Sequence, residues 1–143
     1  MALETKVGAC PELIKAADEL RQIVFIDEQG VLEEEIFDGL NNQAVHVVVF
    51  DRNAPVATAR ILNDGDIYRI GLVAVSKSRR GERLGVKVMQ VAIQHIATNG
   101  GKEVLLTAQQ EVRGFYEKFG FVQCGEAETF ESGFVLVPMK LNL

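Results

Sequence analysis

The chain has 143 residues, 48% of them apolar, which is the size of one ordinary domain and enough to bury a hydrophobic core. With 15 Lys and Arg against 20 Asp and Glu, the net charge of −5 argues against a general nucleic-acid or anionic-membrane surface. Charged residues break up the first twenty positions and no long apolar run follows, so neither a signal peptide nor a membrane span is expected. We therefore expect a single cytoplasmic domain over residues 1–143.

The first half of the chain predicts a strand, a helix, an acidic segment and a β-hairpin. Residues 3–7 form a short apolar strand, and a helical pattern of apolar residues runs from Pro11 to position 24. Six of the twelve residues from 27 to 38 are acidic and none is basic, which favours a loop or a short acidic helix. Residues 46–50 and 56–62 are rich in β-branched side chains and flank a turn-forming segment, a pattern typical of two antiparallel strands.

The second half predicts two strand–helix units followed by two strands. In order, these are a strand at 67–75, a helix at 86–96, a strand at 103–107, a short helix at 111–119 and strands at 121–124 and 134–141. The last strand is apolar enough to lie inside the sheet or to pair across a homodimer, and the pattern leaves both open. The whole order predicts an α/β fold with a mixed sheet.

The cysteines and histidines indicate neither a metal centre nor a redox centre. Cys10 and Cys124 form no CxxC pair, which argues against zinc or thioredoxin-like chemistry and predicts reduced, buried thiols. His46 and His95 lie far apart and lack ligand spacing with carboxylates or cysteines. No metal is expected.

The loop between the strand at 67–75 and the long helix is the strongest candidate for an anion site. Backbone N–H groups at a helix N-terminus are unpaired and carry a partial positive charge, which favours a bound pyrophosphate. Gly81 and Gly85 permit close approach of the backbone, and four cations lie within nine residues: Arg79, Arg80, Arg83 and Lys87. A basic loop is also typical of a solvated surface, but here it stands beside a further motif. The GxxxxGK[ST] and GxGxxG patterns of nucleotide-binding families are absent.

Two motifs and the element order carry a resemblance to a known family. The loop reads Arg80-Gly81-Glu82-Arg83-Leu84-Gly85, and a later segment reads Phe115-Tyr116-Glu117-Lys118-Phe119-Gly120-Phe121. They resemble the Q/R-x-x-G-x-G/A loop and the FYxKxGF helix of the GNAT superfamily of acetyl-coenzyme A dependent N-acetyltransferases. Arg83 occupies the position where the family's central glycine is usual. The order of elements from residue 3 to residue 141 also follows the family's topology.

The resemblance implies a mixed, mostly antiparallel sheet of about seven strands, flanked by helices and splayed between the fourth and fifth strands. It also implies that acetyl-coenzyme A is a cosubstrate held by main-chain groups of the fourth strand, by the Arg80–Gly85 loop and by residues of the later motif. The implied contact residues are Val73, Ala74, Val75, Arg80, Gly81, Glu82, Arg83, Leu84, Gly85, Thr107 and Tyr116. Thr107 replaces an asparagine often found at the end of its strand.

Tyr116 falls on the tyrosine that in many family members protonates the departing thiolate, and is therefore the expected general acid. A phenol has a pKa near ~10, so it is protonated at neutral pH and can donate to sulfur. The alternative interpretation is an amphipathic core residue, flanked by Phe115 and Phe119, with its hydroxyl at the surface.

The general base is less well defined by the sequence. Glu28, Asp38 and His46 lie in or beside the acidic segment, and we take Glu28 as the first candidate; a histidine that begins an apolar strand, as His46 does, is more often structural. The acidic segment also indicates a cationic acceptor, such as a polyamine, an amino sugar or a lysine-like amine, presented by a small molecule or a peptide.

The sequence therefore predicts an enzyme that moves an acetyl group from acetyl-coenzyme A to a primary amine, by direct transfer through a ternary complex. The alternative is a non-catalytic regulatory or sensor module that binds acyl-coenzyme A through the same loop. Neither nucleic acid nor a membrane is expected as a partner.

Overall fold

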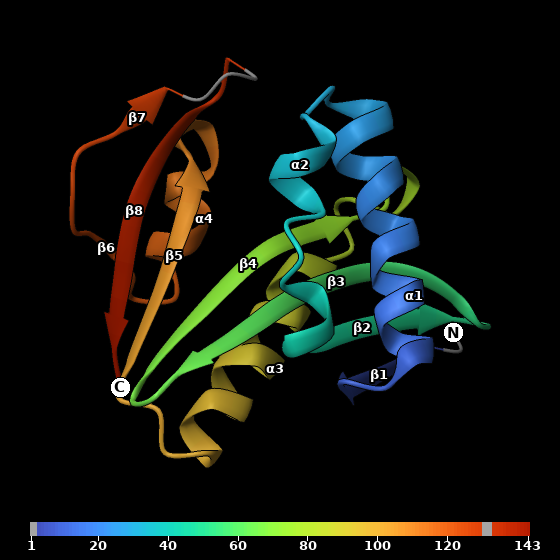
Figure 1. Cartoon of the computed structure of the whole chain (residues 1–143), viewed down its shortest axis with the longest axis horizontal. Coiled ribbons are helices and arrows are strands. Elements are labelled where there is room, and N and C mark those ends of the chain that lie inside the picture. The colour runs from blue at the N-terminus through green and yellow to red at the C-terminus, as the bar shows by residue number, and fades with distance from the viewer. Residues whose placement is uncertain (1–2, 130–132) are drawn as a thin grey trace.

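The computed structural model describes residues 3–129 and 133–143, which form an eight-stranded sheet with helices on both faces (Figure 1). Its strands are β1 (Leu3–Gly8), β2 (Val45–Asp51), β3 (Ala54–Asp64), β4 (Ile67–Val75), β5 (Glu103–Gln109), β6 (Val122–Gln123), β7 (Glu128–Thr129) and β8 (Val135–Asn142). The strand order is β1-β2-β3-β4-β5-β8-β6, and β7 pairs with β8. Only β4 and β5 are parallel, which confirms the mixed, mostly antiparallel sheet that was expected.

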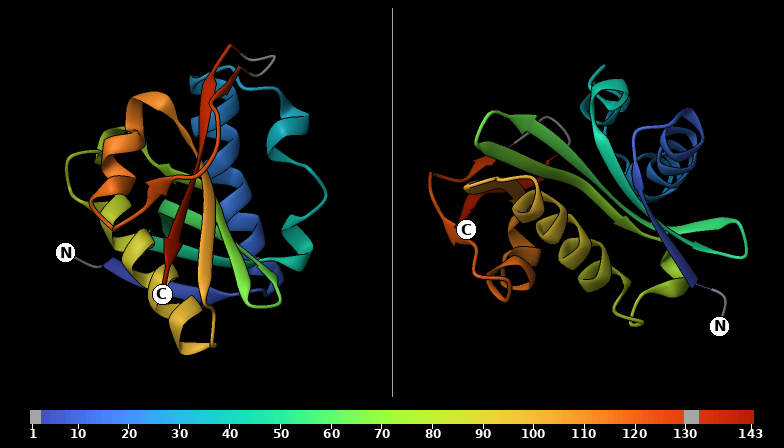
Figure 2. Two further views of the ribbon diagram at one scale, coloured as in Figure 1. Left: turned by 90° about the vertical axis from the view of Figure 1, so that its left-hand side faces the viewer. Right: turned by 90° about the horizontal axis from the view of Figure 1, so that it is seen from below.

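The helices divide between the two faces of the sheet (Figure 2): α1 and α2 cover one face, and α3 and α4 the other. Their bounds are α1 (Pro11–Arg21), α2 (Glu33–Ile36), α3 (Leu84–Thr98) and α4 (Arg113–Glu117), with a π-helical turn η1 (Gln22–Glu28) that continues α1. Short 3₁₀ turns are η2 (Asn41–Gln43), η3 (Lys77–Arg79) and η4 (Gln110–Val112). None of the helices in the described residues combines the length and apolar character needed to cross a bilayer.

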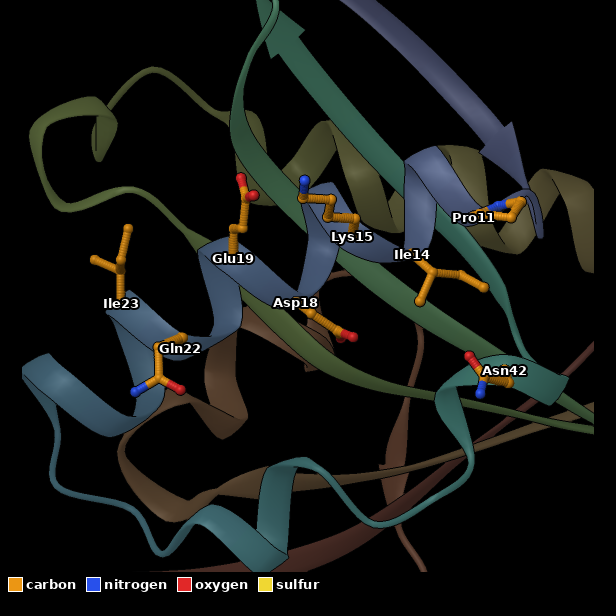
Figure 3. Close-up of a pocket in the computed structure, with 8 residues that line it drawn as sticks. All are labelled: Pro11, Ile14, Lys15, Asp18, Glu19, Gln22, Ile23 and Asn42. Carbon is orange, nitrogen blue, oxygen red and sulfur yellow. The ribbon is translucent and has the colours of Figure 1, made fainter.

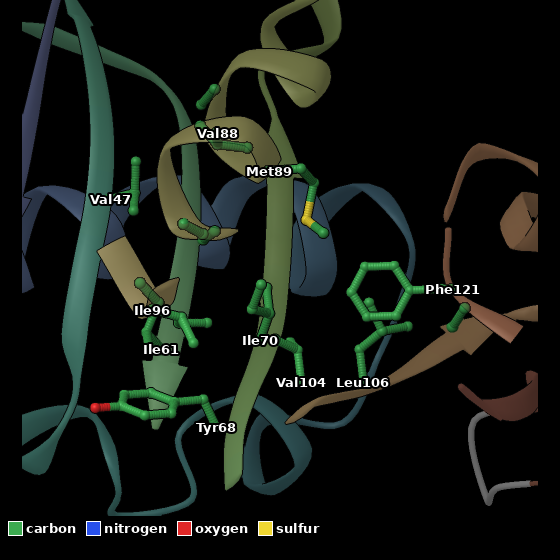
Figure 4. Close-up of a cluster of buried hydrophobic side chains, with 14 of the residues drawn as sticks. Val47, Ile61, Tyr68, Ile70, Val88, Met89, Ile96, Val104, Leu106 and Phe121 are labelled. Carbon is green, nitrogen blue, oxygen red and sulfur yellow. The ribbon is translucent and has the colours of Figure 1, made fainter. Parts of the chain in front are cut away.

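The run Val47-Val48-Val49 in β2 shows why the sheet needs cover on both faces. Successive side chains of a strand point to opposite faces, so a continuous apolar run is stable only where both faces are buried. Val47 and Val49 belong to the main core beneath α3, whereas Val48 packs with residues of α1. Figure 4 shows the main core, to which α3 contributes Val88, Met89, Ala92 and Ile96.

The feature that positions the functional site is the separation of β4 from β5. The two strands pair only from Ile67 opposite Glu103 to Arg69 opposite Leu105, and beyond that point they diverge (Figure 1). On the β3 side, β4 contains one extra residue between its pairings with Thr58 and Arg60, and Leu72 in this bulge has a φ of 48°. Because a bulge bends its strand, it directs the end of β4 away from β5.

Three expectations need correction. The structure contains the short strand β7, which the sequence pattern did not indicate, and the helix expected at 111–119 is divided into η4 and the shorter α4. The prediction of buried thiols is wrong, because Cys10 and Cys124 are both exposed. Cys10 precedes the first turn of α1 and Cys124 follows the edge strand β6, so neither position reaches the core. The strand expected at 134–141 lies inside the sheet as β8, between β5 and β6.

Candidate functional site

A cavity of about 620 Å³ lies where β4 and β5 separate. Its walls come from both strands and from η1, the α2 segment, α4 and β8. The cavity brings together seven residues predicted from the sequence: Val73, Ala74, Val75, Arg80, Gly85, Thr107 and Tyr116. Pockets of this size that combine apolar walls with a few polar groups are typical of ligand sites.

The backbone of β4 is available to a ligand inside this cavity. Ser76 N–H donates to Val56 O at 2.8 Å, on the β3 side, whereas Val75 O accepts from the Arg80 side chain at 3.0 Å. Since backbone groups alternate in direction along a strand, those of Val75 and, two residues earlier, Val73 point away from β3 and into the split. Such a free strand edge can pair with an extended chain.

A smaller hollow of about 250 Å³ adjoins the cavity at the N-terminus of α3. Val75, Arg80, Gly85 and Phe115 line both spaces, so the two are neighbours. The loop residues predicted to bind a pyrophosphate and present here are Arg80, Gly81, Arg83, Leu84 and Gly85. The first turn of α3 therefore presents its unpaired N–H groups beside two arginines, which suits an anion.

Two positions in this loop adopt a left-handed backbone conformation. Gly81 has a φ of 91° and Arg83 a φ of 62°, both in the left-handed region that favours glycine. This explains why glycine suits the position that Arg83 occupies here. At Gly85, an added Cβ would lie 3.3 Å from Cζ of Phe115, so a small residue lets α3 approach α4 closely.

Glu82, which was also expected to contact the coenzyme, lines neither space and holds Arg79 instead. Arg79 donates to Glu82 at 2.8 and 2.9 Å and to Asp51 at 2.6 Å, which ties the loop to the end of β2. Arg83 and Lys87, by contrast, have no ion pair within residues 3–129 and 133–143. The cations near α3 without an ion pair in that part of the chain are thus Arg83 and Lys87, whereas Arg80 lines the hollow and is paired with Glu28.

Glu28, the first candidate for the base, lies in an ion pair. Arg80 donates to both of its carboxylate oxygens, at 2.6 and 2.9 Å, and this hydrogen bonding lowers the pKa of Glu28. A carboxylate stabilised in this way is a weaker proton acceptor, and Glu28 is not among the residues that line the cavity. The geometry therefore favours a role in holding Arg80 between η1 and the end of β4.

His46 and Asp38, the other two candidates, belong to a buried polar cluster. Arg21 Nη1 lies 3.0 Å from His46 Nδ1, and because arginine only donates, Nδ1 accepts and Nε2–H donates to Asn41 O at 2.9 Å. Burial lowers the pKa of His46, which keeps the ring neutral. Asp38 accepts from Arg60 at 2.9 and 3.1 Å. Neither residue lines the cavity, and the contacts of both favour a structural role.

Tyr116 extends from α4 into the cavity. Its ring packs edge-on against Phe115 at 5.0 Å and Phe121 at 6.3 Å between centroids. Burial raises the pKa of Tyr116 to about 12, and its hydroxyl has no hydrogen-bond partner in the described part of the chain. The cavity therefore contains a phenol that stays protonated at neutral pH and is free to donate.

Several lining residues could not be found from the sequence, because they come from segments far from both motifs. Phe25 and Gln29 come from η1 and its end, Glu35 from α2, and Phe134 precedes β8. Gln109 Nε2 donates to Gln29 Oε1 at 3.1 Å, which links the end of β5 to η1 across the split. The pattern of one sequence gives no signal for such a contact, since the residues are 80 positions apart.

Another hollow, of about 820 Å³, runs along the outer face of α1 (Figure 3). Its lining is Pro11, Ile14, Lys15, Asp18, Glu19, Gln22, Ile23 and Asn42. It shares no residue with the cavity between β4 and β5, and it contains none of the groups predicted for coenzyme binding.

The split sheet, the helix N-terminus beside it and the tyrosine in the cavity define an acyltransferase. Residues 16–143 match the acetyltransferase (GNAT) domain, and the chain belongs to this family. It is 32% identical to the uncharacterized N-acetyltransferase YjcF of Bacillus subtilis (strain 168) over 122 residues, which cover 85% of this chain and 87% of YjcF. It is 34% identical to the protein ElaA of Escherichia coli (strain K12) over 113 residues, or 76% of this chain and 74% of ElaA. The crystal structure of Escherichia coli ElaA has a TM-score of 0.84 and 28% identity, covering 96% of this chain and 98% of that one.

Proposed function

We propose that this acyltransferase moves the acetyl group of acetyl-coenzyme A to a primary amine by direct transfer within a ternary complex. The observation that carries the proposal is the meeting of three features: a free β4 edge and the protonated phenol of Tyr116 in the cavity, and the N-terminal turn of α3 at the hollow that adjoins it. When bound, the coenzyme supplies an acetyl group activated as a thioester.

The residues present fit this cosubstrate. The first turn of α3 with Arg80 and Arg83 suits the pyrophosphate. The backbone groups of Val73 and the N–H of Val75 suit the amide-bearing arm, whereas Val75 O accepts from Arg80. Gly85 and Thr107 line the same path. Arg80 already contacts Val75 O, so its side chain joins the anion site to the end of the strand edge.

The chemistry assigned to the chain is a balanced acyl transfer. The lone pair of the neutral amine forms the new N–C bond, the C–S bond breaks, and its electron pair stays on sulfur. Tyr116 donates its phenolic proton to that sulfur, and the nitrogen loses its extra proton to solvent, from which Tyr116 is reprotonated. A backbone N–H near Val75 stabilises charge on the carbonyl oxygen, a contribution of about 3 kcal/mol for one donor in other enzymes.

Two measurements on the same protein test the proposal. Acetyl-coenzyme A and coenzyme A, each at about a hundred times its dissociation constant, should both raise the free energy of unfolding by about 2.7 kcal/mol. With pooled primary amines, acetyl-coenzyme A should then give free thiol and acetylated amine in equal amounts, measured by thiol titration and mass spectrometry. Absence of stabilisation by either coenzyme would overturn the proposal. Stabilisation without transfer to any amine would favour the regulatory or sensor module instead.

A further inference from the structure

Two consecutive residues at the end of η1 are linked to the two strands that separate around the cavity. Glu28, the last residue of η1, pairs with Arg80, whose side chain also donates to Val75 O. Gln29, the next residue, accepts from Gln109 Nε2 at 3.1 Å. Val75 and Gln109 are the last residues of β4 and β5. We call the four side chains of Glu28, Gln29, Arg80 and Gln109 the brace, because they connect the two strand ends across the split.

On the β4 side, the brace consists of four hydrogen bonds from one planar group. Arg80 donates to the two carboxylate oxygens of Glu28, at 2.6 and 2.9 Å, and from Nε and Nη2 to Val75 O, at 3.2 and 3.0 Å. These bonds engage four of the five N–H groups that a guanidinium holds in one rigid plane. A rigid group bonded to two partners fixes the distance between Glu28 and the end of β4. The fifth N–H group, on Nη1, takes no part in these bonds, so Arg80 can contact an anion without leaving the brace.

On the β5 side, the brace is one neutral hydrogen bond between the half-buried side chains of Gln29 and Gln109. The body of η1 packs against β4, because Val24 and Phe25 form an apolar cluster with Ala74. Gln109 belongs to β5, which beyond its short pairing with β4 is paired with β8. The bond between the two glutamines therefore joins η1 and β4 to the end of β5.

The walls of the cavity would approach each other if the strand ends were not held. β4 and β5 pair only as far as Arg69 and Leu105, and they continue to their ends without pairing with each other. The lining of the space between them includes Val73, Leu106 and Phe115. Apolar walls in water are drawn together, because their contact removes apolar surface from water. A connection across the mouth of the split counteracts this narrowing.

We propose that the brace holds β4 and β5 apart in the free protein, so that Glu28 and Gln29 act as positioning residues for the arm of the coenzyme. The role toward the coenzyme rests on the proposed function. The main-chain groups left for the arm are those of Val73 and the N–H of Val75, because Arg80 occupies Val75 O. A split that is already open reduces the entropy lost when the two strands are ordered on binding. The brace therefore favours binding of the coenzyme more than the transfer step that follows.

A distance across the mouth of the split tests the brace without any ligand. Spin labels are attached through Ser78→Cys and Glu111→Cys, at exposed positions shortly after the ends of β4 and β5. The exposed Cys10 and Cys124 are replaced by serine in the same protein, so that only the two chosen positions are labelled. The wild-type brace should give one narrow distribution of distances between the labels.

Variants of the brace should broaden this distribution. We expect Gln29→Ala and Glu28→Ala each to increase its width at least about twofold, and saturating coenzyme A to restore the wild-type width. The control is Gln22→Ala, which removes a bond of 3.1 Å to Asp27 within η1 and should leave the width unchanged (Figure 3). A wild-type width in Gln29→Ala would overturn the inference.

Binding and turnover distinguish positioning from direct contact with the coenzyme. Gln29→Ala and Gln109→Ala should each raise the dissociation constant of coenzyme A at least about fivefold, and leave kcat within about twofold of the wild type. The double variant should bind no more weakly than either single variant, because both remove the same hydrogen bond. Losses that add in the double variant would show that each glutamine contacts the coenzyme directly, and would contradict the positioning role.

The outcomes separate this inference from the proposed function. Unchanged distances in the variants, together with coenzyme binding and acetyl transfer in the wild type, would contradict the brace alone. Broadened distances in a protein that neither binds coenzyme A nor acetylates an amine would contradict the proposed function, and with it the role toward the coenzyme, and retain the brace as the contact that holds the split open.

Discussion

Arg83 has a backbone conformation that is unfavourable for folding and a charge that is favourable for binding an anion. It precedes the first turn of α3 with a φ of 62°, a conformation in which a side chain costs roughly 1–2 kcal/mol. Arg83 also lines the hollow at the helix N-terminus, however, where a cation attracts a pyrophosphate. The two contributions can be measured separately, because one affects folding and the other affects ligand binding.

Arg83→Gly should raise the free energy of unfolding by about 1 kcal/mol and weaken coenzyme A binding about tenfold, as measured by denaturant titration and calorimetry. The control is Arg52→Gly in the β2–β3 turn, where φ is 51° and the loop of α3 is not involved. It should stabilise the fold similarly and leave coenzyme affinity unchanged. Equal coenzyme affinity in both variants would show that the Arg83 charge takes no part in binding.

Tyr116→Phe should lower kcat by at least about tenfold and leave the dissociation constant of coenzyme A near that of the wild type, because the ring remains and only the donor is lost. The chain's other tyrosine supplies the control. Tyr68 is a core residue that does not line the cavity, so Tyr68→Phe should retain the wild-type kcat. Unchanged turnover in Tyr116→Phe would exclude the phenol as the proton donor.

At the scale of elements, a buried polar cluster joins α1, the α2–β2 connection and the sheet. Arg21 from α1 contacts His46 of β2, whose ring donates to Asn41, and Asn41 also accepts from Arg60 of β3 at 3.0 Å. Nε and Nη2 of the fully buried Arg21 have no partner within the described residues. The cluster thus places two cations beside a neutral imidazole, and protonation of that ring is unfavourable.

This arrangement predicts a pH dependence of stability. The folded-state pKa of His46 is lowered, chiefly by burial, so the unfolded chain takes up a proton at a higher pH than the folded one. The contribution of His46 to the free energy of unfolding should therefore be fully present above about pH 6.5. It should fall as the pH decreases from there toward the lowered folded-state pKa, by up to about 1.4 kcal/mol per pH unit.

Denaturant titrations between pH 8 and 5 check this dependence. His46→Gln should abolish the slope, and His95→Gln, which replaces the other histidine on α3, should retain it. The slope is compared, and not the absolute stability, because His46→Gln also removes buried hydrogen bonds. A His46→Gln protein with the wild-type slope would assign the dependence to another group.

Most elements could be predicted from the sequence, because their periodicity is local. The hairpin of β2 and β3 and the long helix α3 are near their expected positions, and the two motifs led to residues that share one cavity. The polar cluster, and the cavity wall contributed by η1, α2 and Phe134, could not be predicted, because they depend on contacts between segments far apart in the sequence. Glu28 is an example: its partner Arg80 lies 52 positions away in the sequence, and the local sequence pattern around Glu28 does not indicate this pairing.

At the scale of the whole molecule, the split sheet predicts a change in backbone protection. The amides of Val73 and Val75 face the cavity and have no strand partner on the β5 side, because that pairing ends at Arg69. Saturating coenzyme A should slow their hydrogen exchange at least about tenfold, at labelling times shorter than global unfolding. Amides of β2, which pairs with strands on both sides, serve as the control and should be unaffected. Unchanged exchange at Val73 and Val75 would mean that this edge is not used.

The three-residue pairing of β4 with β5 also has a consequence for turnover. It is a narrow seam between two lobes, one built on β1 to β4 and the other on β5, β8 and β6. A coenzyme that bonds to one lobe and contacts the other connects the two halves of the sheet across the split. The protein with bound coenzyme should therefore resist local opening more strongly than the free protein. Each catalytic cycle must then break this connection when the coenzyme leaves. A variant in which β4 and β5 pair over more residues should therefore slow product release more than it slows acetyl transfer.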